Sequence, residues 1–190
     1  MWQARRVSPR AFDKRNRLLG LVITPGASVD RDHATLVAIE KGIPDLPVER
    51  LTLGTTSVPR AVDKIVEAGA ALAEKLGVGP HRIAYGGRSF GGRSCSVADA
   101  FIPSATALVL LSYPLHPPGK PEKLRVDHFG DIAVPTLFLS GGKDPFGSPD
   151  EFAEHVPSIP GKTTVEWVTG NHSPKDNDAV VATVKHWLGY

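Results

Sequence analysis

Cysteine is almost absent from this 190-residue sequence, whose single Cys95 excludes an internal disulfide. Long hydrophobic runs are absent too. Residues 1–17 contain no apolar segment of signal-peptide length, and the first apolar run, at 18–24, is too short to span a bilayer and stops at Pro25 and Gly26. We therefore expect a soluble cytoplasmic protein that makes no contact with a membrane.

Recognisable cofactor sites are also lacking. No group of Cys and His residues has metal-ligand spacing. Neither the P-loop pattern nor the glycine-rich dinucleotide fingerprint occurs. These absences lead us to expect a protein without a metal or other cofactor.

The formal net charge of +2 is unevenly distributed. Residues 1–17 hold six basic side chains and one acidic side chain, which leaves a net charge of −3 for residues 18–190. We interpret 1–17 as a basic N-terminal arm and 18–190 as a single domain. No nucleic-acid motif accompanies the arm, so a solvated arm is favoured over one that binds nucleic acid or an acidic partner.

Strand-like and helical segments alternate from residue 18 onward, over a length that suits one domain. Apolar runs predict strands at 18–24, 48–53, 82–85, 107–112, 136–140 and 163–168. Helical patterns are found at 30–40, 59–76, 93–101, 149–155 and 179–188. The alternation predicts an α/β fold built on a doubly wound, mostly parallel sheet.

A glycine-rich stretch at 86–92, Gly-Gly-Arg-Ser-Phe-Gly-Gly, lies between a predicted strand and a predicted helix. Gly87, Ser89 and Gly91 have the G-x-S-x-G spacing of a nucleophile elbow, which places a serine hydroxyl on a tight turn at the carboxyl edge of a parallel sheet. A serine forced towards positive φ needs neighbours without Cβ atoms, so that the strand and the helix can approach closely. The alternative is a glycine-rich turn in which Ser89 only caps the helix.

An acidic residue and a histidine follow two later strands. Asp144 lies in the glycine-rich turn after 136–140, and His172 lies in the turn after 163–168. The order serine, acid, histidine is that of α/β-hydrolases. Because ligands bind at the carboxyl ends of parallel strands, we expect Ser89, Asp144 and His172 to meet as nucleophile, orienting acid and general base.

Negative charge that develops on a substrate carbonyl oxygen needs hydrogen-bond donors. The expected donors are the backbone N–H of Phe90, at the start of the elbow helix, and one N–H from the loop after the first strand. In that loop we choose Ala27, with Gly26 next, because Pro25 has no N–H to donate.

Two further residues are candidates for contact with substrate. Arg88, beside the nucleophile, could bind a substrate carboxylate, and pairing with a local acid such as Asp99 is the alternative. His116 lies in the proline-rich segment 113–131, which we expect to be a loop that covers part of the site.

Four stretches together resemble a family of small α/β-hydrolases: 86–92, 113–125, 134–139 and the turn 142–147 with its Asp-Pro-Phe-Gly motif. The family is related to dienelactone hydrolase and to the hydrolase-like domain of a subunit of a nuclear histone acetyltransferase complex. The resemblance implies an α/β-hydrolase fold without a large cap domain and a triad of Ser89, Asp144 and His172. Dienelactone hydrolase has a cysteine nucleophile where this chain has the serine. The family usually has His-Gly in the oxyanion loop, where this chain has Pro25 and Gly26.

These features predict a serine hydrolase that acts on a small ester or thioester through an acyl-enzyme intermediate. An acyl transferase or perhydrolase would use the same residues with a different acyl acceptor. A hydrolase-like fold kept as a non-catalytic interaction module is the other alternative. Pro25 favours that alternative, and the presence of all three expected catalytic side chains opposes it.

Overall fold

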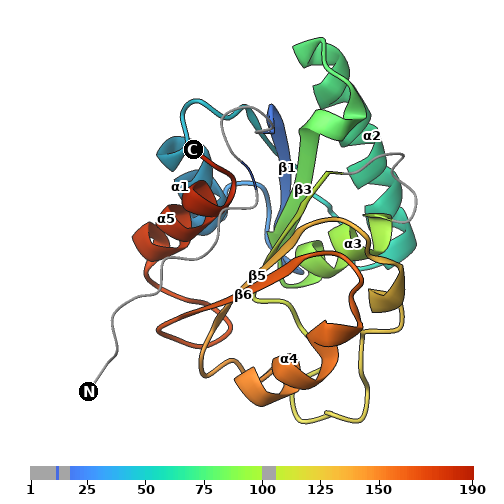
Figure 1. The fold of residues 1–190 in the computed structure, drawn as a ribbon, viewed down its shortest axis with the longest axis vertical. Helices are drawn as coiled ribbons and strands as arrows, with labels where there is room; N and C mark the ends of the chain where they lie inside the picture. Colours follow the sequence, from blue (N-terminus) through green and yellow to red (C-terminus); the bar gives the residue numbers. More distant parts are fainter. Residues whose placement is uncertain (1–11, 13–17, 100–105) are drawn as a thin grey trace.

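The computed structural model describes residue 12, residues 18–99 and residues 106–190, and their central element is a parallel sheet (Figure 1). Within this part of the chain, six strands pair in the order β2-β1-β3-β4-β5-β6, and every pairing is parallel. The strands are β1 (Gly20–Thr24), β2 (Val48–Arg50), β3 (Ile83–Arg88), β4 (Leu108–Leu111), β5 (Thr136–Gly141) and β6 (Thr163–Val168). The predicted doubly wound α/β fold is therefore confirmed, with a sheet that is wholly parallel.

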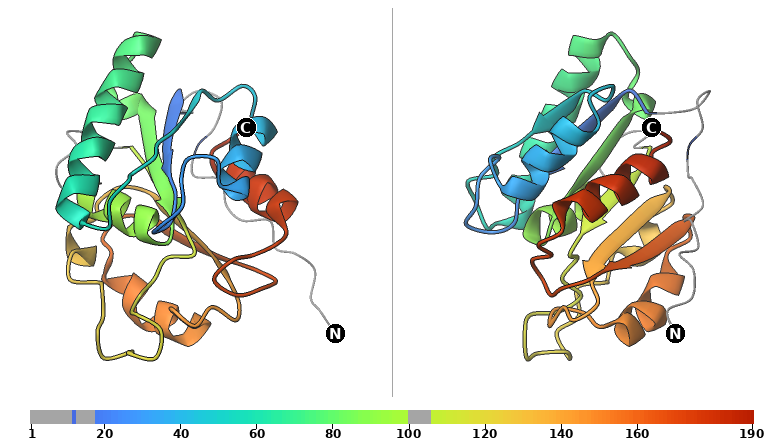
Figure 2. Two further views of the ribbon diagram at one scale, coloured as in Figure 1. Left: turned by 180° about the vertical axis from the view of Figure 1, so that it is seen from behind. Right: turned by 90° about the vertical axis from the view of Figure 1, so that its left-hand side faces the viewer.

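Helices cover both faces of the sheet. Figures 1 and 2 show α1 and α5 side by side on one face and α2 and α3 on the other. The α-helices are α1 (Ala34–Gly42), α2 (Val58–Leu76), α3 (Phe90–Ala98), α4 (Pro149–His155) and α5 (Asn177–Trp187). Short 3₁₀ turns occur at η1 (Pro80–Arg82), η3 (Phe129–Asp131) and η4 (Val156–Ser158).

Alternation along the strands divides the core into two layers. In β1, Leu21 and Ile23 pack with α1 and α5, whereas Val22 packs with the layer that contains α2 and α3. In β5, Leu137 and Leu139 join the first layer and Phe138 joins the second. Successive side chains of a strand point to opposite faces, and both faces are covered, so the strands read as continuous apolar runs.

Two boundaries near the expected site differ from the sequence prediction. The strand predicted at 82–85 continues through the two glycines to Arg88, and the helix predicted at 93–101 begins earlier, at Phe90, and ends at Ala98. The strand continues because Gly86 and Gly87 pair in register with both neighbouring strands. The whole turn between strand and helix is thus Ser89 alone.

The first predicted helix also starts later than expected, at Ala34 and not at residue 30. The Asp30 carboxylate accepts a hydrogen bond from the Asp32 N–H (2.9 Å), which holds a turn, and His33 then caps the helix by accepting from the Thr35 N–H (3.3 Å). Local side-chain bonds of this kind compete with helix formation before the cap.

The first turn of α3 lies directly against the carboxyl end of β1. A Cβ added to Gly91 would lie 2.3 Å from the Pro25 carbonyl oxygen and 2.4 Å from Thr24 Oγ1. A Cβ added to Gly87 would lie 2.1 Å from the same Thr24 hydroxyl. Glycine at both positions lets the elbow and the loop after β1 share one edge of the sheet.

The predicted N-terminal arm falls mostly outside the described residues, with Phe12 as the exception. The Phe12 side chain is only 6% exposed, and its ring packs edge-on against Trp187 of α5, with ring centroids 5.8 Å apart. The expectation of a solvated arm is therefore wrong at this residue, because an aromatic ring gains more from burial against the domain than from solvent.

No helix in the described ranges has both the length and the hydrophobicity required to cross a lipid bilayer.

Replacing Gly91 with alanine should destabilise the fold by about 3 kcal/mol, the upper end of the usual cost of overpacking. The added Cβ would meet backbone atoms of β1 and the following residue, which cannot move aside cheaply. Gly130→Ala is the matched control, because a Cβ there has no atom within 4 Å. Urea-induced unfolding measures both variants, and equal stabilities would contradict the close approach of α3 to β1.

Candidate active site

Ser89 occupies a strained turn between β3 and α3. Its backbone has φ 50° and ψ −118°, in a region that L residues rarely adopt. The Ser89 N–H donates to the Leu111 carbonyl oxygen (2.8 Å), and Arg93 N–H donates to the Ser89 carbonyl oxygen (3.0 Å). Strand pairing on one side and the helix on the other hold the serine in this conformation, which the G-x-S-x-G spacing predicted.

The side chains of Ser89, His172 and Asp144 lie in one hydrogen-bonded chain. His172 Nε2 is 2.8 Å from Ser89 Oγ, and His172 Nδ1 is 2.9 and 3.0 Å from the two Asp144 carboxylate oxygens. The Asp144 side chain is 1% exposed and that of His172 is 17% exposed. The tertiary structure thus brings together the three residues that the sequence singled out on three different strands.

Neighbouring groups fix the acid and the imidazole. The Phe146 N–H donates to Asp144 Oδ1 (2.9 Å). The Phe146 ring stacks on the His172 imidazole, with centroids 3.9 Å apart and planes 24° from parallel. We did not select Phe146 from the sequence as a site residue, although its place in the Asp-Pro-Phe-Gly turn, two residues after the acid, was the available signal.

The expected oxyanion donors border Ser89 from two sides. Phe90 is the first residue of α3, and its N–H has no acceptor among the described residues. Gly26 is buried beside the nucleophile, since a Cβ built on it would lie 3.6 Å from Ser89 Cβ, whereas Ala27 is exposed. The N–H groups of Gly26 and Ala27 therefore both stay candidates for the second donor.

Comparison with known proteins agrees with this architecture. A family model described as an alpha/beta hydrolase domain matches residues 48–188. The chain belongs to the α/β-hydrolase family. The match includes Ser89, Asp144 and His172 and excludes the loop after β1.

Solved α/β-hydrolase structures extend the likeness to almost the whole chain. Dienelactone hydrolase from Anabaena variabilis is 17% identical with a TM-score of 0.70, over 92% of this chain and 87% of that one. Est1E from Butyrivibrio proteoclasticus is 16% identical with a TM-score of 0.71, over 93% and 90%. A thermophilic esterase from Thermogutta terrifontis is 17% identical with a TM-score of 0.69, over 91% and 90%. At these identities the likeness is one of fold. The related histone acetyltransferase subunit stays a prediction from the sequence.

In this α/β-hydrolase, Arg88 has a different position from the one expected. Its Nη2 donates to the His172 carbonyl oxygen (2.7 Å) and to Ser173 Oγ, so the guanidinium bridges the end of β3 and the loop that carries His172. Burial lowers the pKa of Arg88, and nearby Asp144 opposes that shift. The structure shows no pairing with Asp99. The histidine loop engages only Nη2, whereas Nη1 would lie 3.1 Å from a Cβ built on Gly26, so contact of Arg88 with a substrate carboxylate stays a prediction.

His116 is likewise a buried structural residue and not a group that lines the site. Its Nδ1 is 2.8 Å from the Pro117 carbonyl oxygen. Its Nε2 is 3.0 Å from Glu151 Oε1 of α4, an ion-pair distance at an angle too poor for a hydrogen bond. The expectation that His116 contacts substrate is not supported, because both ring nitrogens face other parts of the chain and the residue is 5% exposed.

Cys95 lies close to the elbow, but its buried thiol is a poor nucleophile. Its Sγ donates to the Gly86 carbonyl oxygen (3.1 Å) from a fully buried position. Burial raises the pKa of Cys95 to about 12. The thiol therefore stays protonated at neutral pH, and a thiol in that state is a poor nucleophile. Cys95, in the second turn of α3, is therefore not a candidate nucleophile.

Arg88→Met should slow the labelling of Ser89 by a fluorophosphonate probe by about tenfold or more, because a loosened His172 loop misplaces the general base. Arg88→Lys should recover part of the rate, since one ammonium donor can still reach the His172 carbonyl oxygen. Arg60→Met, on the exposed side of α2, is the control. Urea unfolding identifies any loss of folded protein, and an unchanged labelling rate in folded Arg88→Met would refute the positioning role.

Glu151→Gln should destabilise the fold by about 0.5–1 kcal/mol at pH 7, the scale of a helix cap. Hydrogen bonds from the Ser148 N–H and hydroxyl lower the pKa of Glu151 from its ordinary value of 4.5, with His116 adding to the shift. A lowered carboxyl pKa contributes stability above the unfolded value, and this contribution is lost as the pH falls through the folded value. The gap between wild type and variant should therefore shrink below about pH 4.5.

Glu154→Gln, in the same helix and exposed, is the matched control for Glu151→Gln. Urea unfolding between pH 3 and 7 measures both variants at intervals of about one pH unit. A gap for Glu151→Gln that does not change with pH would show that the carboxylate charge is not what stabilises this end of α4.

Proposed function

We propose that this protein is a serine hydrolase that cleaves a small ester or thioester through an acyl-enzyme intermediate. The observation that carries the proposal is the hydrogen-bonded chain from Ser89 Oγ to His172 Nε2 (2.8 Å) and from His172 Nδ1 to Asp144 (2.9 Å). A serine hydroxyl is a weak nucleophile at neutral pH and needs such a base within hydrogen-bond reach.

In the proposed reaction, Ser89 Oγ attacks the substrate carbonyl carbon while His172 Nε2 takes the hydroxyl proton. Asp144 keeps the Nδ1 proton of His172 in place and stabilises the imidazolium that forms. The imidazolium then donates its proton to the departing alcohol or thiol. His172 then takes a proton from a water molecule, whose oxygen attacks the carbonyl carbon of the acyl-enzyme. The imidazolium returns this proton to Ser89 Oγ as the bond between the serine and the acyl group breaks, which releases the acid and the free serine.

The charge on the tetrahedral oxygen would be met by the Phe90 N–H at the start of α3 and by one N–H of the loop after β1. Gly26 and Ala27 both remain candidates for that second donor. Loss of one such donor typically costs about a hundred- to a thousandfold in rate. Pro25 starts this loop and has no N–H to donate, so the conformation of the loop after it affects how well the substrate carbonyl is held.

The size of the substrate is proposed from the connections at the site. The connection from β5 to α4 is the short turn at 142–148, and β6 leads to α5 through residues 169–176, so neither of these two links holds an inserted cap. Such an open edge suits small or exposed acyl groups. The Thermogutta terrifontis protein is described as an esterase, which agrees with the proposed class of substrate.

An acyl transferase or a perhydrolase would use the same three residues, and would differ only in the molecule that accepts the acyl group from Ser89. A non-catalytic interaction module would have no use for the strained serine backbone, which costs energy in the folded protein. We therefore favour hydrolysis.

A fluorophosphonate probe should label the wild-type protein rapidly at Ser89. Ser89→Ala should abolish the labelling and His172→Ala should slow it by at least about a thousandfold, since the serine then lacks its base. Ser96→Ala is the control, because Ser96 is a buried serine on α3 that bonds to Arg93 and His128 and lies away from the triad. Wild-type labelling no faster than that of Ser89→Ala would overturn the proposed catalysis in favour of the interaction module.

A further inference from the structure

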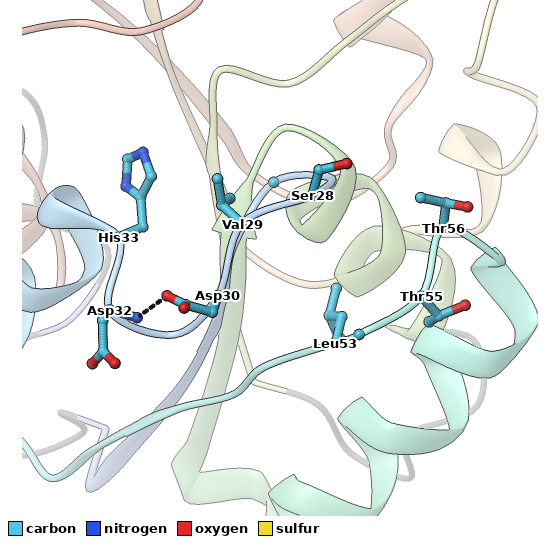
Figure 3. A pocket seen from close by; sticks show the side chains of 10 residues that line it. Ser28, Val29, Asp30, Asp32, His33, Leu53, Thr55 and Thr56 are labelled. Carbon is cyan, nitrogen blue, oxygen red and sulfur yellow. Dashed lines mark hydrogen bonds between the residues drawn. The ribbon is translucent and has the colours of Figure 1, made fainter.

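A groove of about 740 Å³ opens between the loop after β1 and the loop after β2 (Figure 3). One wall comes from residues 26–33 and the other from residues 53–56. Figure 3 shows Ser28 and Asp30 on the first loop across from Leu53, Thr55 and Thr56 on the second. The described residues that line the groove are Gly26, Ser28, Val29, Asp30, Asp32, His33, Leu53, Gly54, Thr55 and Thr56.

The groove lies next to the candidate catalytic serine, with Gly26 between them. Gly26 lines the groove and is also the residue whose Cβ, if present, would lie 3.6 Å from Ser89 Cβ. The Cβ built on Gly26 would also lie 3.8 Å from Val29 Cγ2. A substrate whose carbonyl carbon lies at Ser89 can therefore extend one of its two substituents directly into the groove.

Polar groups without partners line both walls. The hydroxyls of Ser28 and Thr56 make no hydrogen bond to another described residue. Thr55 Oγ1 accepts from the Ser57 N–H (3.0 Å), which leaves its own O–H free to donate. The groove thus offers several hydroxyl donors and acceptors within a short distance of the oxyanion loop.

His33 adds a donor of fixed tautomer. Its Nδ1 accepts from the Thr35 N–H (3.3 Å), so the neutral ring carries its proton on Nε2. Burial lowers the pKa of His33, with the positive charge of Arg88 adding to the shift. At neutral pH the ring is therefore uncharged and can donate one hydrogen bond to a ligand oxygen.

Charged side chains of both signs border the groove. Asp32 pairs with Arg50 (2.7 Å), whereas the Asp30 carboxylate accepts only the Asp32 N–H and forms no ion pair with a described residue. The nearest lysine, Lys64, uses its ammonium on the Leu53 carbonyl oxygen (2.6 Å). No arginine or lysine is among the lining residues, but Arg88 borders the groove beside Gly26, where its Nη1 would lie 3.1 Å from a Cβ built on that glycine.

Apolar surface in the groove is limited. Leu53 is 2% exposed, and Val29 is the one large apolar side chain of the lining that is well exposed, at 42%. A long aliphatic chain gains stability in proportion to the apolar area it buries, and these two residues offer little. The lining fits a group that forms many hydrogen bonds better than it fits a lipid tail.

We propose that this groove binds an uncharged, hydroxyl-bearing group of the substrate, such as a glycerol- or sugar-like alcohol. The inference rests on the proposed hydrolase function and assigns its substrate class. In this arrangement Ser28, Thr55, Thr56 and the His33 Nε2–H bind the ligand hydroxyls, and Asp30 accepts from one of them.

Three esters with the same acyl group test the groove: glyceryl monobutyrate, propyl butyrate and the butyrate ester of hydroxypropionate. Each has a three-carbon alcohol, and they differ only in bearing hydroxyls, no polar group or a carboxylate. Butyrate release measured by pH titration gives kcat/KM for each. The glyceryl ester should exceed the propyl ester by about three- to tenfold or more, the range that one net hydrogen bond supplies.

Two variants separate the groove from the catalytic residues. Asp30→Asn retains an oxygen that can accept the Asp32 N–H and should raise kcat/KM for the carboxylate ester, relative to the propyl ester, by about fivefold as the like charge is removed. Thr56→Val keeps the side-chain shape and should lower the glyceryl-to-propyl ratio by about threefold. Asp45→Asn is the control, because Asp45 is an exposed acid in the connection that enters β2 at its amino end, away from the groove; both ratios should be unchanged.

The outcomes distinguish the two proposals. Equal rates for the glyceryl and propyl esters, with ratios unaffected by Asp30→Asn and Thr56→Val, would overturn the groove assignment while the hydrolase proposal stands. Cleavage of none of the three esters by protein that still labels at Ser89 would also overturn it. Absence of labelling at Ser89 would remove the hydrolase proposal and the groove assignment together.

Discussion

Parallel pairing of the strands is the constraint on which the candidate site depends. Because every strand runs the same way, the turns after β3, β5 and β6 all open at one edge of the sheet, and each delivers one member of the chain Ser89, Asp144 and His172. Adjacent strands lie about 4.8 Å apart, however, and β6 is three places from β3. The His172 loop must therefore cross back over two strands to reach the serine.

Two features allow that crossing. The loop turns through Gly170, which has φ 133°, a conformation that favours glycine, and it passes so close to β5 that a Cβ on Gly141 would lie 2.2 Å from the Asn171 carbonyl oxygen. Arg88 then holds the loop from the other side through the His172 carbonyl oxygen. The residue that precedes Ser89 thus holds the loop that carries His172, and this explains why a partly buried cation is found at the end of β3.

The loops at the carboxyl edge of the sheet fall into two groups. The turns after β3, β5 and β6 carry the candidate triad, whereas the loops after β1 and β2 form a polar groove that includes none of its three residues. Gly26 belongs to both, since it borders Ser89 and lines the groove. A substrate bound across Gly26 would present its carbonyl to the serine and its alcohol to Ser28 and Thr56, so reaction and selection are separable by mutation.

The sequence by itself determined the fold class and the chain positions of the candidate triad. Continuous apolar runs, separated by helical segments, identify buried strands because both faces of a parallel sheet are covered. Each residue of the candidate triad lies four positions after the end of such a run. The bounds of α4 and β6 agree with the sequence prediction because local residue preferences are strong there. Pro149 favours the start of a helix, and the β-branched Thr163, Thr164 and Val165 favour a strand.

Only the tertiary structure decided which polar side chains face the site. His116 and Arg88 were expected to contact substrate, yet one ring is buried against Glu151 and the other side chain bonds to the loop that carries His172. The stacking of Phe146 on His172 and the groove between two loops likewise depend on contacts between residues far apart in the chain. Periodicity records the direction of a side chain relative to its own strand or helix, but not which distant segment comes to lie against it.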